Sequence, residues 1–280
     1  MSKNINTDDK QHLDSVNQFL NTNVQWIPLQ TSGSTNRHFQ AVVDGKSLIL
    51  RLNAADNLAF GVSRKTEANI LDLIEVYNWA PQIIQNNWQE GWCLMLDHSP
   101  ALGAGLPPGG HQKITSVLLD AMSEWQLIRP DSLLVNTYMF NYRRLFNKYR
   151  NVFKAKSSNA TSQNNLHLTD QIESKLNALP SVPHCLTHHD LHPGNICKGD
   201  HQLVVLDWEY AGIGNPWFDA AALHNKFGVL AEDIAILPAF KELNYTKFKQ
   251  GLTDAMGVTK TLDKLWIAAR VEFAAIAITD

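Results

Sequence analysis

The spacing of apolar and polar residues differs between the two parts of the chain. In the first part, two short apolar runs at 40–43 and 47–52 flank Asp44-Gly45, a strong signal for a two-residue hairpin turn. A polar stretch at 31–37 precedes them, and an extended segment at 24–30 comes before that. Apolar residues then recur at helical spacing over 64–78, and the compact apolar run 91–96 predicts another strand. The first part is therefore expected to be rich in β-strands.

The pattern changes after Pro100, where helical periodicity dominates. Helices are predicted over 111–127, 137–153, 169–178, 218–229, 245–255 and 262–278. The polar segment 157–165 is expected to be a mobile loop. This order of elements predicts an α+β, bilobal protein, with a small β-rich lobe over 1–97 and a larger, mainly helical lobe over 98–280.

Composition narrows the class of protein. A chain of 280 residues can form two lobes, and a net charge of −3 without a basic run argues against nucleic acid as the main partner. No apolar run is long enough to span a membrane, and the polar N-terminal residues do not resemble a signal peptide. The three cysteines form no short CxxC pair, so we expect reduced thiols and a cytoplasmic protein.

The stretch LTHHDLHPGN, residues 186–195, is the strongest candidate for chemistry. It is open to three interpretations: a solvated polar loop, a metal site using His188 and His192, or a proton-transfer site. Pro193-Gly194 argues against the helix on which a zinc pair with that spacing is usually found. His188, Asp190 and Asn195 together form H-x-D-x-x-x-x-N, the kinase pattern in which Asp receives a hydroxyl proton and Asn binds magnesium.

Asp207 adds a second carboxylate to this loop. It follows the apolar run 202–206, and a hairpin formed with the preceding strand would return it beside Asn195. Carboxylate and amide oxygens are ligands that Mg²⁺ prefers. Asp207 could also simply cap the next turn, but the upstream motif favours a metal ligand.

The β-rich part offers candidates for binding a nucleotide. Backbone N–H groups and hydroxyls of the polar loop could approach phosphate oxygens. Its candidate residues are Ser32, Gly33, Ser34, Thr35 and Asn36. Arg51 lies within an apolar strand, where a lone charge is costly unless paired, and Glu67 on the next helix is the expected partner. The alternative is that Arg51 points to solvent.

Taken together, the chain resembles the aminoglycoside phosphotransferase and choline kinase superfamily, the small-molecule relatives of protein kinases. The most specific stretch runs from 186 to 221. The resemblance implies ATP and Mg²⁺ as cofactors, with Asp190 as catalytic base and Asn195 and Asp207 as metal ligands. It further implies that Asp219 steadies the catalytic loop and that Arg51 and Glu67 form the nucleotide-lobe ion pair. It also implies that the strand and linker containing Met95 and Asp97 contact adenine.

Two features resemble the choline, ethanolamine and thiamine kinases: Arg51 in place of lysine, and the sequence LDWEYAG after the hairpin. There are departures, since the helix 111–127 ends in SEWQ where the family commonly has Leu-His, and the chain ends soon after its last helix. Both features bear on the acceptor site rather than on phosphoryl transfer.

We therefore expect an ATP-dependent kinase that phosphorylates a small cationic alcohol. Candidate acceptor residues are Glu209, Tyr210 and Trp217, because carboxylates and aromatic faces attract ammonium groups. His188 is expected to brace the loop, and Trp208 to lie in the core. The alternatives are an aminoglycoside or sugar phosphotransferase, a catalytically silent binding protein, and a His/Asp metallohydrolase.

Overall fold

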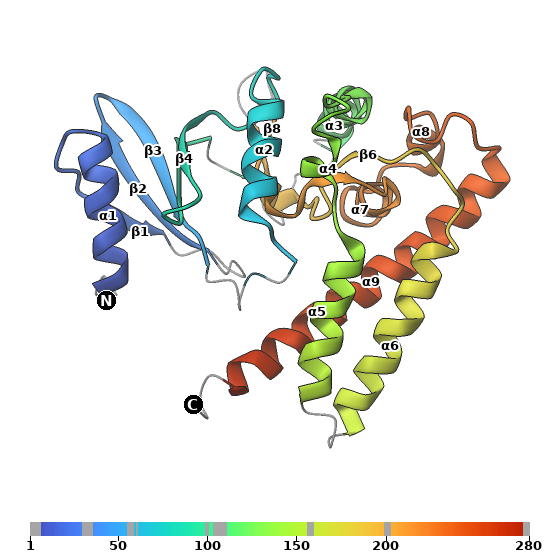
Figure 1. The fold of residues 1–280 in the computed structure, drawn as a ribbon. Coiled ribbons are helices and arrows are strands. Elements are labelled where there is room, and N and C mark those ends of the chain that lie inside the picture. The colour runs from blue at the N-terminus through green and yellow to red at the C-terminus, as the bar shows by residue number, and fades with distance from the viewer. Residues whose placement is uncertain are drawn as a thin grey trace.

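A computed structural model describes residues 7–29, 36–54, 59, 61–98, 101–102, 111–155, 160–198 and 203–276. Figure 1 shows a sheet at one end of the molecule and a larger assembly of helices at the other. The expected α+β architecture, a β-rich part followed by a mainly helical part, is confirmed.

The N-terminal part is a five-stranded antiparallel sheet in the order β1-β2-β3-β5-β4. Its strands are β1 (Ile27–Leu29), β2 (Arg37–Val43), β3 (Lys46–Leu52), β4 (Ile83–Asn87) and β5 (Trp92–Leu96). Asp44 and Gly45 form the predicted hairpin turn, both with positive φ (49° and 76°), as a type I′ turn requires. Strand β4 was not predicted, because the polar residues of IIQNN hide its alternation.

The two faces of this sheet carry different residues, because successive side chains on a strand point to opposite sides. Phe39, Leu50 and Leu94 face helix α1 (Thr7–Phe19) and form a small core with Leu13 and Val16. The alternate positions, including Arg51, lie on the opposite face. Arg51 therefore points toward helix α2 and the rest of the chain.

Helix α2 (Arg64–Ile74) connects the sheet to the C-terminal part. Its side chains Ile70, Leu71 and Ile74 are buried in the large core of the C-terminal helices. Ser63 caps its N-terminus by accepting a hydrogen bond from the Thr66 amide. The sheet and the C-terminal core thus meet at the first turn of α2.

Helices and short strands make up the rest of the chain. The helices are α3 (His111–Leu127), α4 (Val135–Tyr138), α5 (Tyr142–Ala155), α6 (Ala160–Asn177), α7 (Trp217–Phe227), α8 (Ala231–Ala235) and α9 (Tyr245–Ile276). The strands are β6 (Cys185–Thr187), β7 (Ile196–Lys198), β8 (Leu203–Val205) and β9 (Gly212–Gly214). The pairs β6–β9 and β7–β8 are antiparallel. No helix in the described ranges is long and apolar enough to cross a membrane.

Two predictions for these helices are wrong. Helix α6 begins at Ala160, inside the segment 157–165 that was expected to be a loop. The two predicted helices over 245–255 and 262–278 are one helix, α9. Gly257 lies within it and has open space around its Cα, so the helix passes this position without a break. In Figure 1, α5 and α6 lie side by side in the lower part of the molecule, and α9 crosses them on its way from α8 to the C-terminal end.

Three tryptophans join the central elements. Trp79, Trp125 and Trp208 pack with ring centroids 5.5 Å apart in each pair. The Trp208 indole donates to the Val205 carbonyl at 2.8 Å, and Trp79 accepts the Val205 amide through its own carbonyl at 2.8 Å. Trp208 lies in the core, as predicted. This cluster fixes the end of β8, where the candidate metal ligand Asp207 is found.

Candidate active site

His188 braces the loop that carries Asp190. Its ring is fully buried; Nδ1 accepts the Asp190 amide at 3.3 Å and Nε2 is 2.9 Å from the Leu206 carbonyl. Because Nδ1 accepts, the hydrogen is on Nε2 and is donated to Leu206. Burial lowers the pKa of His188 to about 4, so the ring is neutral at pH 7. Both nitrogens are used, so His188 is a brace rather than a base or a metal ligand.

The main chain on either side of Asp190 is held by further hydrogen bonds. Asp219 Oδ2 accepts the His188 amide at 2.8 Å, and Asp219 Oδ1 accepts the His189 amide at 3.0 Å. On the other side, the Asn195 amide nitrogen donates to the Asp190 carbonyl at 3.0 Å. Burial raises the pKa of Asp219 to about 7, and its two backbone hydrogen bonds oppose that rise. These hydrogen bonds hold the main chain on both sides of the Asp190 side chain.

The Asp190 side chain itself is 40% exposed. Desolvation raises its pKa to about 6; the positive charge of Lys226 opposes the rise, and Glu209 and Asp263 add to it. A carboxylate with this pKa is mostly ionised at pH 7 and can accept a proton. His192 lies nearby, with Nε2 3.9 Å from Asp190 Oδ2 and Nδ1 accepting the Gly194 amide at 3.0 Å.

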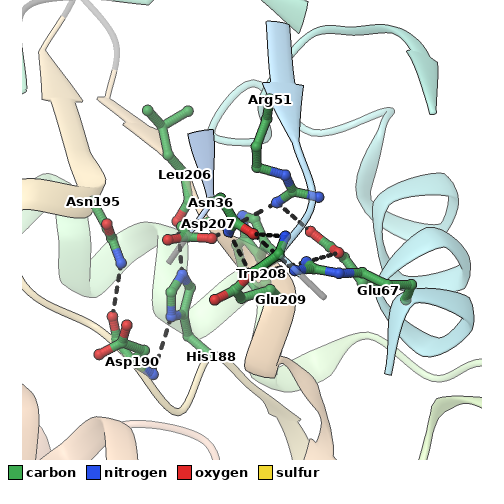
Figure 2. Close-up of polar contacts among 12 residues, drawn as sticks. Asn36, Arg51, Glu67, His188, Asp190, Asn195, Leu206, Asp207, Trp208 and Glu209 are labelled. Atoms are coloured by element: carbon green, nitrogen blue, oxygen red, sulfur yellow. Dashed lines mark hydrogen bonds and ion pairs between the residues drawn. The ribbon is translucent and has the colours of Figure 1, made fainter. Parts of the chain in front are cut away.

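Asp207 lies beside Asn195, as the predicted hairpin requires. Strands β7 and β8 pair, and the Leu206 amide donates to the Asn195 carbonyl at 2.7 Å. Asp207 has a left-handed backbone (φ 62°), which turns its side chain into the space between Asn195 and Arg51. Figure 2 shows these side chains converging from the hairpin, the catalytic loop and β3.

This arrangement fits a hard divalent cation. Among the residues the structure covers, Asp207 Oδ1 is buried without a hydrogen-bond partner, and its nearest cation, Arg51 Nη1, is 3.8 Å away. Burial raises the pKa of Asp207 well above its usual range, and the neighbouring Glu209 carboxylate raises it further. An unpaired buried carboxylate oxygen next to an amide oxygen is a suitable donor set for Mg²⁺. Over the same ranges, no cluster of three or more His, Cys, Asp or Glu side chains is placed to hold a metal ion, so the donor set here consists of one carboxylate and one amide.

The expected Arg51–Glu67 ion pair is present, with Arg51 Nη1 2.6 Å from Glu67 Oε1, and both side chains are buried. The pair keeps the pKa of Glu67 below its usual value despite burial. Arg64, at the start of α2, adds a second cation: its Nη1 donates to Glu67 Oε2 at 2.9 Å. Two guanidinium groups thus share the carboxylate of Glu67.

Glu209 joins this network from the C-terminal side. Its Oε2 accepts hydrogen bonds from Arg64 Nη1 at 2.8 Å and from Asn36 Nδ2 at 2.7 Å. Asn36 Oδ1 in turn accepts from the Ala54 amide and from Arg64 Nη2, both at 2.9 Å. Residues far apart in sequence are therefore tied together at the junction of the sheet, α2 and the turn after Asp207.

The structure corrects two acceptor predictions. The Glu209 carboxylate is buried and paired with Arg64 and Asn36, so the prediction that it offers its charge to the acceptor is wrong. Trp217 is fully buried; it packs on Phe240 and Phe248 and donates to the Pro180 carbonyl. Trp217 is a core residue, and its prediction as an acceptor residue is wrong.

The remaining candidates for nucleotide binding lie either outside the described residues or on the sheet and the linker after it. The loop residues Ser32, Gly33, Ser34 and Thr35 lie outside the described residues. Met95 is half-buried on β5, on the same face of the sheet as Arg51. The Asp97 carboxylate accepts hydrogen bonds from Gln40 at 2.7 Å and Ser47 at 2.9 Å, which holds the linker against the sheet.

Sequence reasoning missed two residues on α9, near Asp190 and Tyr210, and one in the ion-pair network. Asp263 on α9 contributes to the field at Asp190, and Trp266 on the same helix donates to the Tyr210 hydroxyl at 3.3 Å. The missed network residue is Arg64, and its i,i+3 spacing to Glu67 was a usable signal. No comparable signal in the sequence links α9 to the catalytic loop.

Comparison with known proteins agrees with this geometry. Residues 120–249 match the model of a phosphotransferase enzyme family. A sequence search of curated proteins found no match.

Solved structures share the fold over most of the chain. Choline kinase LicA from Streptococcus pneumoniae has 15% identity and a TM-score of 0.62, covering 95% of this chain and 99% of its own. The ethanolamine kinase of Plasmodium vivax has 15% identity and a TM-score of 0.66, covering 88% and 77%. An ADP-bound aminoglycoside phosphotransferase, APH(2'')-Ib, has 12% identity and a TM-score of 0.59, covering 92% and 99%. The family match covers the segment that carries Asp190, Asn195 and Asp207, and the solved structures show that this chain shares their fold over most of its length.

Proposed function

We propose that the protein transfers the γ-phosphoryl group of ATP to the hydroxyl of a small cationic alcohol. Residues 1–97 then serve as the nucleotide lobe and 98–280 as the catalytic and acceptor lobe. The observation that carries the proposal is the exposed Asp190 carboxylate on a fully braced loop, beside Asn195 and the unpaired oxygen of Asp207. Such a site combines a proton acceptor with ligands for a phosphate-bound cation.

In the proposed reaction, Asp190 orients the acceptor hydroxyl and takes its proton as the oxygen attacks the γ-phosphorus. The new bond joins that oxygen to phosphorus, and the bond from phosphorus to the β-phosphate oxygen breaks, releasing ADP. Arg51 provides positive charge toward the phosphates and is held in place by Glu67. Asn195 and Asp207 would hold Mg²⁺, which neutralises charge on the phosphate oxygens when bound.

The charge distribution supports a requirement for a cation. Two guanidinium groups, Arg51 and Arg64, are surrounded by three carboxylates, those of Glu67, Asp207 and Glu209. The Asp190 carboxylate lies close enough to contribute to the raised pKa of Asp207. This excess of negative charge favours a divalent ion and disfavours a free anionic nucleotide.

Support for a cationic acceptor comes from α9 rather than from Glu209. Asp263 is exposed on this helix and adds to the negative field at Asp190. One turn away, the Trp266 indole donates to the Tyr210 hydroxyl, and the Arg270 guanidinium lies 4.6 Å from the Trp266 ring centroid, so this ring already attracts one cation. Aromatic faces and a carboxylate together attract an ammonium group.

The test is an acceptor panel with ATP and Mg²⁺, with ADP release as the readout. The panel contains choline, ethanolamine, thiamine, two aminoglycosides and neutral sugars. We expect turnover on a small cationic alcohol, with a KM for that alcohol about tenfold higher in Asp263→Asn, a loss typical of one charged contact. Asp254→Asn, which removes another exposed carboxylate on α9, is the matched control.

Other outcomes discriminate among the alternatives. Turnover of aminoglycosides or sugars alone would show that the proposed class of acceptor is wrong. The proposed phosphoryl-transfer activity would still hold. Binding of MgADP without ADP release on any acceptor would indicate a silent binding protein. Phosphate release that depends on zinc would indicate a metallohydrolase.

A further inference from the structure

His189, directly before Asp190, has a left-handed backbone conformation with φ 66°. Residues with a Cβ rarely adopt this conformation, although His, Asn and Asp do so more often than most others. Such a conformation persists only where the surroundings impose it, and it is often found at functional sites. The contacts of the His189 side chain show what imposes it here.

The His189 ring is held on several sides. It stacks on Phe140, with centroids 4.1 Å apart and planes inclined by 24°, and it packs against Phe218 at 5.0 Å. Its Nε2 is 2.6 Å from the Tyr142 hydroxyl, at the first residue of α5. Burial lowers the pKa of His189 to about 3, so the ring is neutral.

The direction of this hydrogen bond follows from a third partner. The Asn215 amide donates to the Tyr142 hydroxyl oxygen at 2.7 Å. The hydroxyl hydrogen is therefore directed to His189 Nε2, which accepts it. The hydroxyl of the half-buried Tyr142 thus connects the loop before α7 to the loop that carries Asp190.

His189 and Tyr142 lie close to β9. A Cβ added at Gly214 on β9 would lie 2.7 Å from His189 Cε1 and 2.7 Å from the Tyr142 hydroxyl oxygen. The neighbouring Phe140 amide donates to the Ile213 carbonyl at 3.1 Å, which keeps the segment before α5 against β9. The His189 ring and the Tyr142 hydroxyl therefore pack directly against the backbone of β9.

We propose that Tyr142 and His189 are positioning residues for Asp190: the Tyr142 hydroxyl holds the His189 ring, and the ring holds the left-handed turn that directs the Asp190 carboxylate to the acceptor. The inference rests on the proposed function, because it takes Asp190 as the base. It assigns to the start of α5 a role in catalysis, although no residue of α5 lies in the reaction path.

The experiment compares Tyr142→Phe, His189→Gly, His189→Ala and the Tyr142→Phe/His189→Gly double variant with wild type and Asp190→Asn. ADP release is measured with MgATP and the most active alcohol of the panel, and MgADP binding is measured by calorimetry. Tyr149→Phe, another buried tyrosine of α5, is the matched control. Thermal unfolding is recorded for each variant so that activity is compared well below its melting temperature.

Tyr142→Phe keeps the stacking on Phe218 (5.5 Å, 18°) and loses only the hydroxyl. We expect its kcat to fall about tenfold, as small misplacements of a catalytic group do, with the KM for ATP and the affinity for MgADP within about twofold of wild type. His189→Gly should keep more activity than His189→Ala, because glycine adopts the left-handed conformation without strain. In the His189→Gly background, Tyr142→Phe should have little further effect.

Each other result overturns the inference. An unchanged kcat in Tyr142→Phe, with Asp190→Asn inactive, rejects the positioning role and leaves the proposed function intact. Equal losses of kcat and MgADP affinity would show a general structural role, and so would an alanine variant as active as the glycine variant. Normal turnover in Asp190→Asn would instead reject the proposed function itself.

Discussion

Two groups of charged residues lie side by side at the centre of the molecule. They differ in how close each charge lies to an opposite charge and in how exposed the side chains are. In the ion-pair network formed by Arg51, Arg64, Glu67 and Glu209, opposite charges lie within 2.9 Å and the side chains are 2–12% exposed. In the catalytic group, Asp190 is 40% and Asp207 32% exposed, and their nearest basic partners are 3.9 Å and 3.8 Å away. Each carboxylate of the first group has a guanidinium nitrogen within 2.9 Å, whereas neither carboxylate of the second group has a basic nitrogen closer than 3.8 Å.

This difference indicates that the first group stabilises the fold and that the second group binds ligands. A buried charge is tolerated when it is paired, so the ion-pair network holds the sheet, α2 and the turn after Asp207 together. Carboxylates that lack a close cation destabilise the folded chain. A ligand that supplies positive charge there stabilises it by binding. The unpaired group therefore marks where the proposed metal and acceptor bind, and the paired group marks the scaffold that positions them.

The largest expected effect is on the catalytic side. Asp190→Asn keeps the shape of the side chain and removes the proton acceptor, so transfer should fall ~10²–10⁴-fold while MgADP binding stays within about twofold. Steady-state ADP release and calorimetry measure the two quantities. Asp233→Asn, an exposed change on α8, is the control. Near-normal turnover in Asp190→Asn would contradict the claim that the second group, and not the ion-pair network alone, takes part in the reaction.

On the paired side, the largest effect should be on stability. Arg51→Met leaves Glu67 buried beside one cation instead of two, and breaking a buried pair in this way costs about 3–5 kcal/mol. The Arg51→Met/Glu67→Met double variant should lose less than the sum of the single variants, because it strands no partner within the pair. Urea unfolding measures both. Strict additivity would contradict a coupled network.

Removing the unpaired carboxylate should have opposite effects on stability and on metal use. Asp207→Asn deletes a buried charge, so unfolding without Mg²⁺ should be unchanged or harder, whereas the Mg²⁺ concentration for half-maximal activity should rise about tenfold. Glu209→Gln is the matched comparison from the paired group: it should lower stability. If both variants behaved alike in both measurements, the two groups would not differ as proposed.

Much of the catalytic side could be predicted because its residues are local. His188, Asp190, Asn195 and Asp207 fall in one loop and the hairpin after it, and a polar motif with fixed spacing survives any uncertainty in the tertiary structure. The hairpin turn at Asp44-Gly45 was predictable for the same reason. Their contacts depend on short stretches of chain with strong local preferences.

The errors lie where a side chain depends on distant partners. Glu209 meets Arg64 across 145 positions and Asn36 across 173, and no local pattern specifies these distances. Trp217 looked like a candidate for the acceptor site because it follows the motif, but Phe240 and Phe248 enclose it. The left-handed His189 likewise requires Tyr142, which lies 47 residues earlier.

The smallest effect concerns stability against pH. His188 is buried and His189 is half-buried; desolvation lowers their pKa values to about 4 and about 3, so both are neutral at pH 7, whereas unfolded histidine has a pKa near ~6.5. As pH falls below ~6.5, these histidines are protonated in the unfolded chain, whereas in the folded chain they stay neutral down to about pH 4. Each histidine therefore lowers the free energy of unfolding as pH falls, by up to ~1.4 kcal/mol per pH unit. Above pH ~6.5 neither contributes a slope. Raised carboxylate pKa values, such as that of Asp219, act in the opposite sense, so the informative quantity is the difference between variants.

His189→Asn should flatten the dependence between pH 6 and pH 5 by about 1 kcal/mol relative to wild type in urea unfolding, while the exposed change His167→Asn on α6 leaves it the same. An unchanged slope in His189→Asn would mean that His189 is protonated in the folded protein, and the direction assigned to its hydrogen bond with Tyr142 would then be wrong.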